Sequence, residues 1–204
     1  EPDVQIGVLG GTFDPVHNGH MIVAEETRRQ LNLSEVLFVP AGQPWLKEDS
    51  SVLAAEHRIQ MVRLAIAGKP YFKLSTVEVD RDGPTYTVDT IAELRTTIND
   101  GDELFFMLGW DNLAQLPQWK EISRLIEMCS LVTIHRPGYQ LPDLSSLETV
   151  VPGLSQKLVI LDKPAVDISA TDIRGRVAMD LSISHLVPEP VDEYIKTHGL
   201  YLTG

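Results

Sequence analysis

Two histidines stand three residues apart near the start of this chain, at His17 and His20, shortly after the glycine pair Gly10 and Gly11. Side chains at this spacing on a helix project to the same side. Each imidazole can therefore offer an N–H group to one anion. The first backbone amides of a helix, at the positive end of its dipole, favour an anion at the same place. The pattern predicts a phosphate site.

The segments on either side of these residues have the periods of a strand and a helix. Residues 4–9 form a short apolar run of the kind found in a buried strand, and residues 21–31 continue a helical face that includes His20, Ala24 and Leu31. We therefore expect a strand, a tight turn at the two glycines and a helix start. Glycine at such a turn lets the backbone come close to a ligand, because no Cβ stands in the way.

Ordinary explanations exist for each feature taken alone. Two glycines after a strand most often only make a tight turn, and one histidine near a helix start is more often a cap or a surface residue. A simple turn needs neither two histidines nor the Phe13-Asp14-Pro15 segment. Because these features occur together with the glycines in eleven residues, a functional site is the favoured explanation. A zinc site is not expected, because the sole cysteine, Cys129, is remote and no third ligand lies at a usual spacing.

Length and composition narrow the class of protein. With 204 residues, 43% of them hydrophobic, the chain suits a single domain over residues 1–204, with a C-terminal helical portion at about 168–204. One cysteine and no apolar run of membrane-spanning length indicate a soluble, cytoplasmic protein that binds no membrane. The net charge of −12 argues against binding nucleic acid, but not against small anions held by local groups.

The remaining pattern alternates strands with helices. Strands are expected at 4–9, 35–40, 72–79, 103–109, 129–134 and 157–161, and helices at 21–31, 56–67, 85–94, 122–127 and 187–196. Residues 139–155 suit a surface excursion with room for a short helix. This order predicts an α/β fold with a Rossmann-like, open, mostly parallel sheet and helices on both faces. Neither G-x-G-x-x-G nor a P-loop motif occurs, which disfavours a dehydrogenase or a P-loop enzyme.

Other polar and aromatic residues fall where a ligand could meet them. Ser169 and Asp172 have the spacing of a helix cap, which is the ordinary explanation, while Thr171 and Arg174 add donors suited to a triphosphate. The segment 85–94 is either a capped helix or a second anion site. Trp119 suits the core and ring stacking equally well.

Residues 10–20, GGTFDPVHNGH, resemble the motif of nucleotidyltransferases that share HxGH with class I aminoacyl-tRNA synthetases. Residues 168–174, ISATDIR, resemble the second motif of that family, I-S-S-T-x-x-R, and further segments follow the order found in bacterial nicotinate-nucleotide adenylyltransferases. The resemblance implies that ATP and nicotinate mononucleotide react to give the deamido dinucleotide and pyrophosphate, with Mg²⁺ accompanying ATP and no covalent enzyme intermediate.

The same resemblance implies roles for individual residues. His17 and His20 would donate to the transferring phosphoryl group and Arg174 would hold the leaving group. Contacts with ATP would come from Gly10, Gly11, Thr12, Phe13, His17, Gly19, His20, Gly109, Asp111, Ile168, Ser169, Thr171 and Arg174. Contacts with the mononucleotide would come from Asp14, Pro44, Trp45, Lys47, Thr85, Tyr86, Asp111, Trp119 and Arg136.

The chain departs from the family pattern at three places. The second loop lacks the usual histidine before Lys47, Ala170 replaces a serine, and Trp110 stands where a small residue is usual. Two alternatives stay open: a sister adenylyltransferase acting on phosphopantetheine or nicotinamide mononucleotide, and a module that binds ATP without turning it over. Homo-oligomerisation is left open as well.

Overall fold

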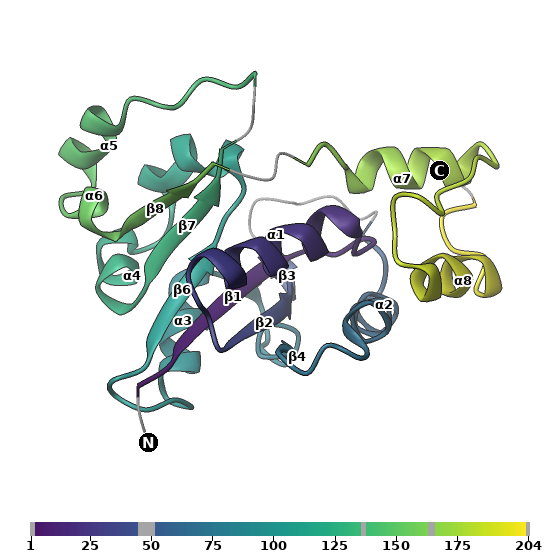
Figure 1. Ribbon diagram of the computed structural model, residues 1–204, viewed down its shortest axis with the longest axis horizontal. Coiled ribbons are helices and arrows are strands. Elements are labelled where there is room, and N and C mark those ends of the chain that lie inside the picture. Colours follow the sequence, from purple (N-terminus) through teal and green to yellow (C-terminus); the bar gives the residue numbers. More distant parts are fainter. Residues whose placement is uncertain (1–2, 45–51, 136–137, 163–165, 203–204) are drawn as a thin grey trace.

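In the computed structural model, which describes residues 3–44, 52–135, 138–162 and 166–202, one six-stranded sheet runs through the molecule (Figure 1). Its strand order is β4-β2-β1-β6-β7-β8, and each described pair of neighbours is parallel. The strands are β1 (Gln5–Gly11), β2 (Glu35–Pro40), β4 (Phe72–Leu74), β6 (Glu103–Met107), β7 (Ser130–Ile134) and β8 (Leu158–Leu161). The expected α/β fold with an open parallel sheet is confirmed.

Helices cover both faces of the sheet, as the sequence predicts. They are α1 (Asn18–Gln30), α2 (Ala55–Ile66), α3 (Thr87–Arg95), α4 (Ile122–Met128), α5 (Leu144–Val150), α6 (Leu154–Lys157), α7 (Ala170–Ala178) and α8 (Glu189–Thr197). Successive side chains of a strand point to opposite faces. Leu9 accordingly packs with residues of α1, α2 and α8, whereas Val8 packs with residues of α3 and α4.

The strand order reverses between β1 and β6. From β1 the chain builds β2 and β4 on one side, and after α3 it returns to build β6, β7 and β8 on the other. At such a reversal the connections leave the carboxyl ends of neighbouring strands in opposite directions, which opens a crevice where ligands bind in sheets of this kind. The fold therefore places a crevice beyond the ends of β1 and β6.

Several local expectations are wrong. The strand expected at 72–79 ends at Leu74, because Asp80 donates its amide to Thr76 and accepts from the Thr76 hydroxyl at 2.6 Å, which closes a turn. Residues Pro84–Thr85 do not open a helix, since they form β5, which pairs with β3 (Gln43–Pro44), and α3 begins at Thr87.

The strand expected at 103–109 ends at Met107 and is followed by an unforeseen 3-10 helix, η1 (Trp110–Gln118). The excursion at 139–155 contains α5 and the start of α6 rather than one short helix.

The C-terminal segment lies beside the first half of the chain. Helices α7 and α8 stand at one end of the molecule, near α2, and α5 and α6 stand at the opposite end (Figure 1). His57 in α2 and Tyr194 in α8 share a hydrogen bond of 2.8 Å between Nδ1 and Oη. Within the described ranges, the helices lack the length and apolar character that crossing a membrane would require.

Gly42, which follows β2, packs against the segment that leads to β5. A Cβ at this position would collide with the backbone carbonyl of Glu78 and lie 3.1 Å from the Thr85 Cγ2 atom. We expect Gly42→Ala to lower the free energy of unfolding by about 1–3 kcal/mol, because backbone must move to admit the methyl group. Denaturant titration followed by circular dichroism measures this change.

Gly175, inside α7, is the matched control. A Cβ there would meet none of the described atoms within 4 Å, so alanine should stabilise the helix by about 0.5–1 kcal/mol. A wild-type denaturation midpoint for Gly42→Ala would contradict the close packing of these two segments.

Candidate active site

A cavity of about 390 Å³ opens at the crevice between β1 and β6. Its walls come from the ends of β1, β6 and β7, from one side of α1, from the start of η1 and from the residues that lead into α7. Of the residues expected at the site, the structure brings together Gly10, His17, Gly19, His20, Gly109, Asp111, Trp119, Ile168 and Ser169 in the lining. Segments separated by up to about 160 residues therefore share one cavity.

The two glycines do not form the expected turn. Gly10 and Gly11 are the last residues of β1 and pair with Val39 and Pro40 of β2. Gly10 is needed for a different reason, because a Cβ there would press on the Phe106 ring at 3.3 Å. The chain turns later, over residues 12–17, which we call the catalytic loop because it leads to the two candidate catalytic histidines.

His17 and His20 lie face to face at the start of α1. Their ring centroids are 3.7 Å apart and the rings are nearly parallel, at 27°. The backbone N–H of His17 donates to Nδ1 of His20 at 3.1 Å. Gly19 makes this arrangement possible, since a Cβ at that position would stand 2.8 Å from the His17 ring.

Burial keeps both imidazoles neutral. It lowers the pKa of His17 to about 4. Burial, and then the positive charge that His17 would carry when protonated, lower the pKa of His20 well below its usual value. A neutral ring that accepts at Nδ1 carries its proton on Nε2. His20 is thus held as a donor whose Nε2–H group is oriented by the start of its own helix.

Phe13 supports His20 from the side. Its ring meets the imidazole edge to face at 4.9 Å between centroids, and only 1% of Phe13 is exposed. Phe13 does not belong to the described lining of the cavity and adopts a left-handed backbone with φ of 52°. Phe13 therefore supports His20, which lines the cavity, and is not itself part of the cavity surface.

The start of α7 forms another wall. The Ser169 hydroxyl accepts from the backbone N–H of Asp172 at 3.1 Å, so the expected cap is present. Ile168 and Ser169 line the cavity, whereas Thr171 and Arg174 lie outside its described lining. Arg174 instead reaches the catalytic loop and donates to the backbone carbonyl of Asp14 at 2.8 Å.

The wall formed by β6, η1 and β7 contains residues that sequence reasoning missed. Trp110 meets His135 edge to face at 4.9 Å between ring centroids, and both residues line the cavity with Thr133. Thr133 is the last residue but one of β7, and His135 directly follows the strand. Ligand contacts gather at such carboxyl ends in parallel sheets. The position of His135 directly after a predicted strand could have marked it as a candidate site residue. The sequence does not show, however, that β7 lies next to β6, and this follows only from the strand order.

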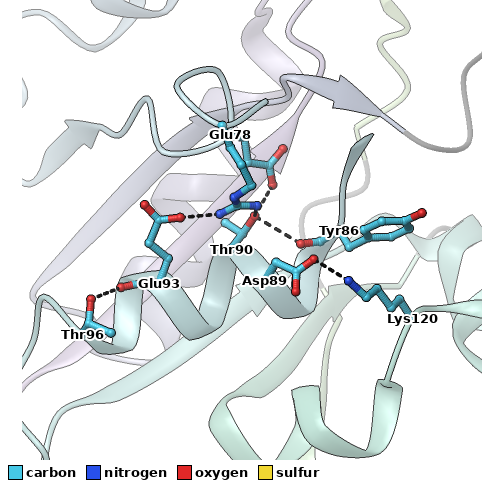
Figure 2. Close-up of polar contacts among 8 residues, drawn as sticks. Glu78, Tyr86, Asp89, Thr90, Glu93, Thr96 and Lys120 are labelled. Carbon is cyan, nitrogen blue, oxygen red and sulfur yellow. Dashed lines mark hydrogen bonds and ion pairs between the residues drawn. The ribbon is translucent and has the colours of Figure 1, made fainter. Parts of the chain in front are cut away.

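Trp119 packs against the core and also lines the cavity. The side chain is half-buried and its ring meets Phe106 edge to face at 6.1 Å, yet it also lines the cavity. Nearby, Lys120 pairs with Asp89 at 2.9 Å and its Nζ atom lies 4.6 Å from the centre of the Tyr86 ring (Figure 2).

Several expected contacts lie elsewhere. Gly11, Thr12, Asp14, Thr85 and Tyr86 are outside the described lining of the cavity. Asp14 is 5% exposed, and its carboxylate accepts from Tyr201 and from the amide of Leu53. For Pro44, the structure describes only its backbone, which belongs to β3. Trp45, Lys47 and Arg136 fall outside the described residues.

The cavity offers unsatisfied polar atoms but no metal cage. Four buried side-chain atoms of lining residues make no hydrogen bond within the part of the chain that the structure describes: His17 Nδ1, Thr27 Oγ1, Trp119 Nε1 and Thr133 Oγ1. Leaving buried polar atoms unpaired costs free energy, so a polar ligand gains by pairing with them. No cluster of three or more His, Cys, Asp or Glu among the described residues could hold a metal ion.

Comparisons with known proteins agree with this geometry. Residues 8–176 match the model of the cytidylyltransferase-like family. The chain is 48% identical over 198 residues to a protein of Dehalococcoides mccartyi named probable nicotinate-nucleotide adenylyltransferase, and the match covers 97% of each. A protein of the same name from Roseiflexus sp. is 44% identical over 197 residues, covering 96% of this chain and 97% of the relative.

A solved structure shares the fold. Nicotinic acid mononucleotide adenylyltransferase of Plasmodium falciparum, complexed with NaAD, superposes with a TM-score of 0.78 at 20% identity, and the match covers 98% of both chains. The family model and the relatives at 44–48% identity show that the chain belongs to the cytidylyltransferase-like family and to the nicotinate-nucleotide adenylyltransferases.

Proposed function

We propose that this chain transfers the adenylyl group of ATP to nicotinate mononucleotide, a step of NAD biosynthesis. A phosphate oxygen of the mononucleotide attacks the α-phosphorus, the bond from that phosphorus to the bridging oxygen breaks, and pyrophosphate leaves. The observation that carries the proposal is the pair of stacked, neutral imidazoles at one cavity with Trp119. The name of the relatives at 44–49% identity supports the same reaction.

The size and lining of the cavity suit nucleotides. A volume of about 390 Å³ lies within the usual range for small-molecule sites, and the lining combines aromatic rings with a few polar groups. The indole of Trp119 suits the face of a pyridine ring, and Asp111 suits ribose hydroxyls beyond the end of a strand.

The mechanism needs alignment and charge stabilisation rather than a covalent intermediate. The mononucleotide phosphate is already a nucleophile, so the protein has to orient it toward the α-phosphorus and stabilise the charge that develops. His20 donates from Nε2 to the transferring group, and His17 stacks against it. Arg174, next to the catalytic loop, suits the departing pyrophosphate.

Magnesium enters this proposal as part of the substrate. The described residues contain no cluster that could hold a metal ion, whereas triphosphate oxygens bind Mg²⁺ strongly. We propose that Mg²⁺ arrives on ATP and offsets part of the charge of the phosphates. In a chain with a net charge of −12, such neutralisation also eases the approach of ATP.

The reaction is tested by following pyrophosphate release from ATP and Mg²⁺ with one of three acceptors: nicotinate mononucleotide, nicotinamide mononucleotide or phosphopantetheine. We expect the fastest release with nicotinate mononucleotide. A preference for phosphopantetheine would indicate the sister activity. ATP binding without release with any acceptor would indicate a binding module.

His20→Ala should lower turnover by about a hundredfold or more, because one preorganised donor to the transition state is lost. Steady-state kinetics under saturating substrates measures this, and a thermal melt confirms folding. His185→Ala, which removes an exposed imidazole outside the cavity lining, is the control and should retain the wild-type rate. An unchanged rate for folded His20→Ala would remove this residue from the mechanism.

Stability should fall in acid because His17 is buried in its neutral form. Its pKa is about 4 in the folded chain and 6.5 when exposed, so the unfolded state binds more protons between these values. The stabilisation is complete above about pH 6.5 and is lost as the pH falls toward 4, by about 2–3 kcal/mol. Denaturant titrations at pH 7 and pH 4.5 should therefore differ less for His17→Gln than for the wild type.

Trp119→Ala should weaken binding of nicotinate mononucleotide by about 1–3 kcal/mol if the indole stacks on the pyridine ring. Isothermal titration calorimetry with the mononucleotide measures the change, and Trp119→Phe, which keeps an aromatic face, should recover part of it. If Trp119→Ala unfolds the protein instead, the packing of this ring on Phe106 is its main role.

A further inference from the structure

The catalytic loop, residues 12–17, is held by side chains from three distant parts of the chain. Arg58 in α2 donates to the backbone carbonyl of Thr12 at 2.8 Å. Arg174 in α7 donates to the backbone carbonyl of Asp14, also at 2.8 Å. Tyr201, beyond α8, donates its hydroxyl to the Asp14 carboxylate at 2.6 Å. The proposed function gives no role to Tyr201.

The contact between Tyr201 and Asp14 has the properties of a fixed anchor. Asp14 is 5% exposed, and its second carboxylate oxygen accepts from the amide of Leu53 at 3.3 Å. Burial, and then the hydrogen bond to Asp14, raise the pKa of Tyr201, so the phenol keeps its proton and remains the donor. Hydrogen bonds to a carboxylate are shorter and stronger than those between neutral groups.

Asp14 joins this anchor to Arg174. Its carboxylate binds Tyr201 while its carbonyl binds Arg174, so a single residue connects two parts of the C-terminal segment to the catalytic loop. Asp14 is three residues before His17, whose backbone amide orients His20. A shift of Asp14 would therefore move the guanidinium and the imidazoles relative to each other.

We propose that Tyr201 is a positioning residue for adenylyl transfer: through the Asp14 carboxylate, it keeps the catalytic loop and Arg174 in the geometry that the transition state requires. This inference rests on the proposed function. Tyr201 itself is outside the described lining of the cavity, so it acts through Asp14 and touches neither substrate.

Positioning should affect turnover more than ground-state binding. Misplacing catalytic groups by a fraction of an ångström weakens interactions that form fully only in the transition state. The walls that would receive the mononucleotide, around Trp119, are on β6 and η1 and make no described contact with Tyr201. The Michaelis constant for the mononucleotide should therefore change little.

The test compares two tyrosines of the same segment. Tyr201→Phe removes only the hydroxyl that binds Asp14, and Tyr194→Phe, the matched control, removes the hydroxyl that binds His57 and makes no described contact with the catalytic loop. We expect kcat to fall about tenfold in Tyr201→Phe, with KM for nicotinate mononucleotide within about twofold of wild type. Tyr194→Phe should keep the wild-type kcat.

A double-mutant cycle tests whether the effect passes through Asp14. Asp14→Asn keeps the size of the side chain but loses the charge that accepts from Tyr201. If the two residues act as a unit, the double variant should be no slower than the slower single variant. Independent, multiplying losses would overturn the coupling.

A readout without turnover separates this inference from the proposed function. Amide hydrogen exchange in residues 12–17 of the ligand-free protein should speed up about tenfold in Tyr201→Phe and stay unchanged in Tyr194→Phe. A wild-type protein that releases no pyrophosphate would contradict the proposed function, whereas wild-type kcat and wild-type exchange in Tyr201→Phe would overturn the anchor alone.

If Tyr201→Phe does not fold, Asp14→Asn provides the same kinetic and exchange measurements. If neither variant folds, the pair serves stability rather than positioning, and the inference is wrong.

Discussion

The parallel pairing of β1 with β6 is the contact on which the candidate active site depends. Its register sets Leu9 beside Met107, so Gly10, near the end of β1, and Gly109, just beyond β6, line the same cavity. Register is fixed because Val8 and Leu9 belong to cores on opposite faces, and a slip of one residue would exchange them. The positions of the histidines and of η1 are therefore consequences of how two strands, far apart in sequence, bury their side chains.

In the proposed reaction, this crevice presents neutral imidazoles to a polyanion. Burial that keeps His17 and His20 uncharged also removes water from their surroundings, and a hydrogen bond is electrostatically stronger in such a setting. Oriented donors there cost no reorganisation when charge develops on a transferring phosphoryl group. Positive charge has to come from elsewhere, which is consistent with Arg174 lying beside the catalytic loop and with a metal that accompanies ATP.

Local patterns predicted the six strands of the main sheet, most helices and the residues at the start of α1, because each depends on near neighbours in sequence; they missed β3 and β5. They failed at Gly10 and Gly11. Glycine is common in tight turns, but it is also needed where a strand packs closely against an aromatic ring. The position of Phe106, which shows that the second explanation applies to Gly10, is known only from the structure. Residues 75–79 alternate like a strand, but the hydrogen bonds between Thr76 and Asp80 close a turn. The cavity position of His135 required the strand order, which no local pattern contains.

The catalytic loop is where local and long-range forces conflict. Phe13 adopts a φ of 52°, a conformation that costs a residue with a side chain about 1 kcal/mol or more. The loop therefore does not hold this shape unaided. Arg58, Arg174 and Tyr201 supply contacts that reach across 46 to 187 positions of sequence, so the shape of the loop depends on α2, α7 and the C-terminal segment. The geometry of the candidate site is for this reason tied to the packing of the whole chain, because the residues that support the loop lie far from it in sequence.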